Sequence, residues 1–61
     1  SYNRVVRLLQ NRNFPIDVEE ITTIAGSAYE IERRETDAVL DALADRGVIE
    51  REGDQLFRPN E

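Results

Sequence analysis

The sequence of 61 residues contains no cysteine, no histidine and no lysine. These absences exclude disulfides, metal sites built on thiolates or imidazoles, and catalysis by cysteine or histidine. The apolar runs are all short, so the sequence predicts no membrane-spanning helix and no signal peptide. The chain begins at Ser1 and has no methionine. We therefore expect a single domain, residues 1–61, excised from a larger protein.

Catalysis is the least expected class of function. Carboxylates are numerous, but they fall on the predicted solvent-facing sides of helices, with no histidine and no glycine-rich phosphate loop beside them. A chain of this length is also too short to enclose a cleft built from carboxylates alone. The sequence therefore predicts no enzyme, no catalytic residues, no metal site and no cofactor.

Positive charge is scarce, and arginine supplies all of it. Thirteen acidic residues outnumber eight basic ones, for a net charge of −5. An acidic, lysine-free surface is typical of adaptation to concentrated salt, and arginine in place of lysine is also typical of a high-GC genome. Both explanations stay open, and we expect a cytoplasmic protein. The charge opposes nonspecific DNA binding at ordinary ionic strength, whereas in molar salt the Debye length falls to about 3 Å and the repulsion largely vanishes.

The first predicted helix runs from Ser1, which can cap it, to about Gln10. Its apolar positions follow helical spacing: Tyr2, Val5, Val6, Leu8 and Leu9. The segment Phe14-Pro15-Ile16 is short and interrupted by proline, which favours an extended connector or a short edge strand.

The second predicted helix begins at Asp17. Asp17 and Glu20 fit a capping box, and Ile16 and Ile21 are spaced as a hydrophobic staple around it. The expected buried side consists of Val18, Ile21, Ile24 and Ala25. Gly26 is predicted to end this helix.

The start of the third helix is ambiguous. Ser27 and Glu30 fit a second capping box, but Ile31 is out of phase with the apolar stripe that follows. We therefore expect a regular helix over residues 32–46, with Tyr29 and Ile31 packed over the core edge. Its buried stripe is Thr36, Val39, Leu40 and Leu43. The turn before it would exceed the three or four residues usual in helix-turn-helix units.

A β-hairpin is predicted after the third helix. Gly47 follows the last helical residues, where a left-handed conformation costs glycine nothing, and Val48 can contact Leu43. Residues 48–51 and 55–58 read as two antiparallel strands with Gly53 at the tip. Adjacent residues of a strand point to opposite faces, so of residues 56 and 57 only one can face the helices.

The order of these elements resembles the winged-helix superfamily over nearly the whole chain. The matching segments are Phe14-Pro15-Ile16-Asp17 and residues 42–58, ALADRGVIEREGDQLFR. The second is similar to the end of MarR- and ArsR-type regulators. It also resembles the C-terminal winged-helix modules of archaeal replicative helicases and of the middle subunit of replication protein A. The resemblance implies an α+β, mostly α fold with three helices and a C-terminal two-stranded wing.

The resemblance also implies a DNA-binding module of a transcription regulator or replication-type protein, with the third helix and the wing contacting duplex DNA. The side chains expected at that interface are Arg33, Arg34, Arg51, Arg58 and Gln55.

A second hypothesis is a protein-interaction winged helix that docks a basic segment of a partner. Its expected residues are the acidic ones of the third helix and the wing: Asp37, Asp41, Asp45, Glu52 and Asp54. The arginines also have a purely structural interpretation, in which Arg33 pairs with Asp37 and Arg34 with Glu30 as i, i+4 surface partners.

Overall fold

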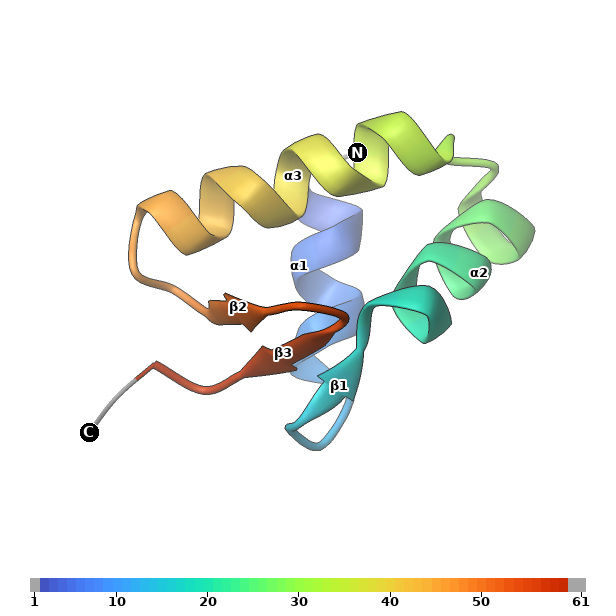
Figure 1. Cartoon of the computed structure of the whole chain (residues 1–61). Helices are drawn as coiled ribbons and strands as arrows, with labels where there is room; N and C mark the ends of the chain where they lie inside the picture. Colours follow the sequence, from blue (N-terminus) through green and yellow to red (C-terminus); the bar gives the residue numbers. More distant parts are fainter. Residues whose placement is uncertain (1, 60–61) are drawn as a thin grey trace.

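A computed structural model describes residues 2–59, in which helices α1 (Tyr2–Gln10), α2 (Val18–Tyr29) and α3 (Arg33–Asp45) pack around one apolar core (Figure 1). The three helices confirm the predicted α+β, mostly α architecture. The expectation that Ser1 caps the first helix lies outside the described residues. No helix within residues 2–59 is both long and apolar enough to cross a membrane.

Three short strands form an antiparallel sheet in the order β1-β3-β2: β1 (Ile16–Asp17), β2 (Glu50–Glu52) and β3 (Gln55–Phe57). Of the two alternatives for residues 14–16, the edge strand is the one found, but it comprises Ile16–Asp17, with Ile16 opposite Leu56. The hairpin strands are shorter than predicted: residues 48 and 49 lie before β2, and residue 58 lies after β3. Gly53 has φ +59°, as a two-residue hairpin loop with glycine first requires. Leu56 is fully buried and Phe57 only partly, as alternation predicts.

The core is built from the predicted apolar stripes. Its most deeply buried large side chains come from all three helices and from β3: Val5, Ile21, Leu40, Leu43 and Leu56. The stripe of α3 is buried as expected, and so is Ile31, at 6% exposure. Residues of each helix thus meet on one side, which leaves the outer side of α3 to solvent.

The prediction that Gly26 ends the second helix is wrong. Helix α2 continues to Tyr29, so Ser27 lies inside it and cannot cap a third helix with Glu30. The left-handed residue is Glu30, at φ 56°, and the amide of Ile31 then donates to the carbonyl oxygen of Ala25 at 3.1 Å. Continuing the helix places Tyr29 and Ile31 against the core, and their burial outweighs the helical cost of glycine, about 1 kcal/mol.

The turn between α2 and α3 is accordingly short. It consists of residues 30–32, which is the usual length in helix-turn-helix units, and the predicted longer turn is wrong. The capping box at Asp17 is also absent: Asp17 is the N-cap residue but makes no side-chain capping bond. Its backbone belongs to β1, and the amide of Val18 donates instead to the carbonyl oxygen of Asp54 at 2.8 Å.

The end of α3 follows the prediction. Gly47 adopts φ 78°, and its amide donates to the carbonyl oxygen of Ala44 at 3.1 Å. The amide of Val48 donates to the carbonyl oxygen of Leu43 at 3.0 Å, which completes a Schellman motif. This stop turns the chain directly into the β2–β3 hairpin, which lies alongside α3 (Figure 1).

Candidate functional site

Helix α3 and the hairpin form one continuous outer surface, because α3 packs against β2 (Figure 1). The outer side of α3 is lined by exposed residues one helical turn apart: Arg34, Ala38, Asp41 and Asp45. Between residues 2 and 59, no group of three or more acidic side chains is arranged to hold a metal ion. The surface offers charged and hydrogen-bonding side chains.

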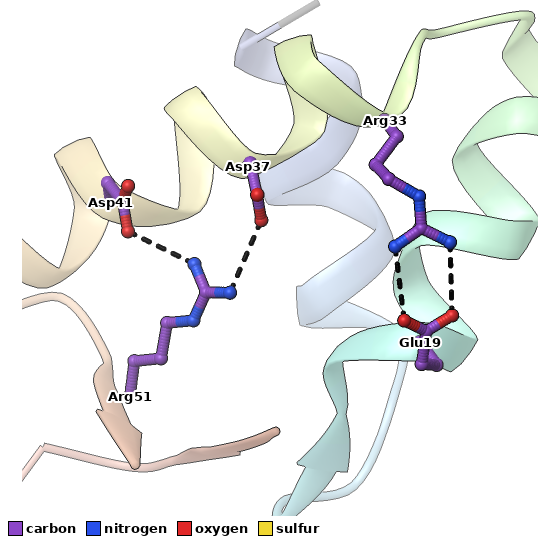
Figure 2. A network of polar contacts seen from close by, with 5 residues as sticks. All are labelled: Glu19, Arg33, Asp37, Asp41 and Arg51. Atoms are coloured by element: carbon purple, nitrogen blue, oxygen red, sulfur yellow. Dashed lines mark hydrogen bonds and ion pairs between the residues drawn. The ribbon is translucent and has the colours of Figure 1, made fainter. Parts of the chain in front are cut away.

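Arg51 of β2 joins the hairpin to α3. Its guanidinium donates to Asp41 at 3.0 Å and to Asp37 at 3.2 Å (Figure 2). The two carboxylates are four residues apart on one helix, so a single planar guanidinium reaches both. Because both carboxylates remain about half or more exposed, at 49% and 72%, the contribution to stability is on the order of 1 kcal/mol at most.

Arg33 is held by Glu19 of α2 rather than by Asp37, so the i, i+4 prediction for Arg33 is wrong. The two guanidinium nitrogens donate to the two carboxylate oxygens at 3.0 and 3.2 Å (Figure 2). These hydrogen bonds, and then the opposite charges, lower the pKa of Glu19 and raise the pKa of Arg33. The packing of α2 against α3 brings together residues that are 14 positions apart, which helical periodicity alone does not predict.

Arg34, Arg58 and Gln55 have different surroundings. Arg34 is exposed and makes no ion pair within residues 2–59, so the predicted pair with Glu30 is absent. Arg58, beyond the end of β3, places its guanidinium carbon 5.3 Å from the centre of the Phe14 ring. Gln55 is exposed on β3. The structure thus places Arg34 on α3 and Arg51 and Gln55 on the hairpin. It places Arg58 against Phe14, which lies between α1 and β1.

The acidic residues of the alternative site share the outer surface. Asp45, Glu52 and Asp54 are exposed there, whereas Asp37 and Asp41 already accept hydrogen bonds from Arg51. Helix α3 and the hairpin Glu50–Phe57 together carry seven acidic and three basic side chains, a net charge of −4. Most of the protein's excess negative charge is therefore concentrated on this surface.

Sequence reasoning missed most of the contacts that the arginines make. Arg4 lies over the Tyr29 ring at 5.3 Å, and Arg12 pairs with Glu20. Arg46 lies over the Tyr2 ring at 5.6 Å and also donates to its hydroxyl at 3.1 Å. The Arg46 contact joins residues 44 positions apart, so no local spacing could have indicated it. Internal contacts of this kind engage six of the eight arginines.

A comparison with protein families gave a match over most of the chain. The family described as "Winged helix C-terminal domain", with the short name WHD_C_halo, matches residues 1–56. Neither the curated proteins nor the solved structures gave a match. The matched residues cover all three helices, the helix-turn-helix and the hairpin to within one residue of its end. The chain therefore belongs to this winged-helix family.

Proposed function

We propose that this domain binds duplex DNA, with α3 in the major groove and the β2–β3 hairpin beside it on the backbone or minor groove. Winged-helix domains as a class bind DNA or proteins and are typically not enzymes. The observation that carries the proposal is the three-residue turn between α2 and α3, which gives the helix-turn-helix its usual length. With that turn, α3 leaves its outer side exposed along its whole length. We further propose that the domain has no catalytic activity and that the protein is cytoplasmic.

Arg34 is the first contact that we assign. It is exposed in the first turn of α3 and has no internal ion pair within residues 2–59. Residues at the start of a recognition helix reach base edges or the phosphates flanking them. Gln55, exposed on the hairpin, can donate to a phosphate or to a groove edge.

Three further arginines would contact DNA after leaving internal partners. Arg33, Arg51 and Arg58 are engaged by Glu19, by the α3 carboxylates and by an aromatic ring. The ion pairs of Arg33 and Arg51 involve carboxylates that are about half or more exposed, and such pairs contribute about 0.2–1 kcal/mol each, so exchange of a carboxylate for a phosphate costs little free energy. While it stays in place, Arg51 also neutralises part of the charge of Asp37 and Asp41 towards an approaching phosphate.

Because the outer surface is negatively charged, we expect DNA binding to require concentrated salt. At ordinary ionic strength a surface of net charge −4 repels DNA, whereas in molar salt charges more than about 3 Å apart are screened. The short name of the family, which contains "halo", supports the same salt-adapted interpretation. We therefore expect binding in molar salt to depend on hydrogen bonds and close contacts rather than on long-range attraction.

The experiment is an NMR titration of the nitrogen-labelled protein with a mixed-sequence duplex, at about 0.05 M and again at molar salt. We expect amide shifts on α3 and the hairpin in molar salt, and weaker shifts or none at about 0.05 M, where the charge of the surface repels DNA. Arg34→Ala should weaken binding about tenfold, as the loss of one charge-assisted contact implies. Arg7→Ala is the matched control, because Arg7 is exposed on α1, also makes no ion pair within residues 2–59, and carries the same charge. If the two variants weakened DNA binding equally, Arg34 would contribute only its charge and would not contact the DNA directly. No shift at either salt concentration would refute the proposal.

A second candidate function rests on the exposed carboxylates of the same surface. Asp41 and Asp45 lie one turn apart on the outer side of α3, and Asp41 already accepts a hydrogen bond from the guanidinium of Arg51. A basic partner segment could dock on this face with the same bonding pattern. Replacement of both residues by lysine should then abolish capture of an arginine-rich peptide, and Asp17→Lys on β1 is the control. A double variant that still binds the peptide would exclude this face.

A further inference from the structure

An apolar hollow lies outside the outer side of α3 and the β2–β3 hairpin. It has a volume of about 320 Å³ and is lined by Val6, Leu9, Gln10, Arg12, Phe14, Leu43, Val48, Ile49, Arg58 and Pro59. None of these residues belongs to the outer side of α3 or to the hairpin Glu50–Phe57. A ligand in the hollow would therefore leave the outer side of α3 and the hairpin free, and of the proposed DNA contacts it would involve only Arg58.

The charge of the hollow is opposite to that of the rest of the protein. Two arginines line it, and none of the described lining residues is acidic, although the chain as a whole has a net charge of −5. Arg58 makes no ion pair within residues 2–59, and its guanidinium lies over the ring of Phe14. A guanidinium packed on an aromatic ring keeps its edge donors available for a carboxylate. Arg12 pairs with Glu20, so its charge is partly offset.

The apolar part of the hollow is incompletely covered by the protein itself. Val48 is 48% exposed, the largest exposed fraction among the large hydrophobic residues of the described chain. Val48 follows the left-handed Gly47 of the Schellman motif, and a hydrophobic residue there ordinarily packs back on its own helix, here at Leu43. Val48 and Leu43 both line the hollow; Leu43 is buried, so Val48 supplies the apolar surface that is open to a ligand. The volume is at the small end of ligand clefts, about 300–1,000 Å³, and suits one or two apolar side chains.

From these observations we propose that the hollow binds a partner protein through a segment in which apolar side chains stand next to carboxylates. The apolar side chains enter between α1 and Val48, and a carboxylate accepts from Arg58 at the rim. Charge complementarity selects this occupant: the rest of the molecule repels an acidic segment, and the hollow attracts one. The proposal is independent of DNA binding by α3.

The test is an NMR titration of the labelled protein, without DNA, with two blocked peptides of sequence Glu-Leu-Phe-Glu and Gln-Leu-Phe-Gln. We expect the acidic peptide to shift the amides of Val6, Leu9, Val48 and Arg58, with half-saturation at roughly millimolar concentration. The neutral peptide should bind about tenfold more weakly, because it lacks the charge-assisted hydrogen bond.

Three variants separate the two parts of the interaction. Arg58→Gln should weaken the acidic peptide about tenfold and leave the neutral one unchanged. Val48→Ser should weaken both peptides, and Arg34→Gln, an equal loss of charge on α3, should change neither. Equal binding of the two peptides, shifts confined to α3, or no shifts would overturn the proposal. Octanoate binding as tightly as the acidic peptide would also overturn it, because the site would then take a free fatty carboxylate rather than a protein segment.

Discussion

Replacement of Gly26 by alanine should stabilise the protein, although the sequence around Gly26 is typical of a helix end. Gly26 lies inside α2, three residues before its last residue, and is not among the positions with positive φ. A Cβ added there would lie 3.7 Å from the carbonyl oxygen of Ile31, an ordinary van der Waals contact. Alanine is favoured over glycine within a helix by about 0.8–1.0 kcal/mol. Because helix ends fray, we expect a gain of about 0.5–1 kcal/mol.

Urea denaturation followed by circular dichroism measures this gain. The midpoint should rise with an unchanged slope, and the thermal midpoint should rise by about 2–8 °C for a domain of this size. Gly47→Ala is the matched control: nothing lies within 4 Å of the added Cβ, but φ is +78°. That variant should lose about 1 kcal/mol through backbone strain alone. If Gly26→Ala destabilised the protein as Gly47→Ala does, α2 would end at Gly26 and the described continuation to Tyr29 would be wrong.

Three further predictions concern single side chains. Glu30→Gly should stabilise the protein by about 0.5–1 kcal/mol in the same assay, because Glu30 occupies a left-handed conformation at φ 56° that glycine adopts freely; a loss would contradict this. Thr36→Val should stabilise it by about 1 kcal/mol, because Thr36 is fully buried and its Oγ1 has no hydrogen-bond partner among residues 2–59; a loss of stability on denaturation would indicate a partner. Pairing with Arg33 lowers the pKa of Glu19 in the folded state, so the stability from this pair is present above the ordinary glutamate pKa and is lost as the pH falls through the lowered value. Glu19→Gln should flatten this part of the acid-side stability curve, and an unchanged curve would show that the pair is not formed.

The short elements show how far periodicity reaches. The stripe of α3, the left-handed Gly47 and the hairpin loop at Gly53 were predictable, because each depends on residues within one turn of one another. The end of α2 was not, because local glycine chemistry at Gly26 competes with the burial of Ile31, which depends on the rest of the core. Where the two compete, the larger buried area prevails.

The same distinction between local and long-range contacts applies to the candidate site. The sequence placed arginines and carboxylates on α3 and the wing, which is the information that an i, i+4 pattern contains. It could not indicate that Arg33 would bind Glu19 or that Arg51 would bridge Asp37 and Asp41, since these partners are 10 to 14 residues apart.

The pattern of apolar residues and glycines therefore determined the three helices, the hairpin and the core, the charged residues determined the acidic character, and the resemblance to known families indicated the winged helix. Only the tertiary structure decided which arginines are engaged, how long the helix-turn-helix turn is, and where an apolar hollow with two arginines lies. The physical reason is range. Helical and strand periodicities act between neighbours in sequence, whereas ion pairs, ring contacts and hollows form between elements whose relative positions follow from packing of the whole core.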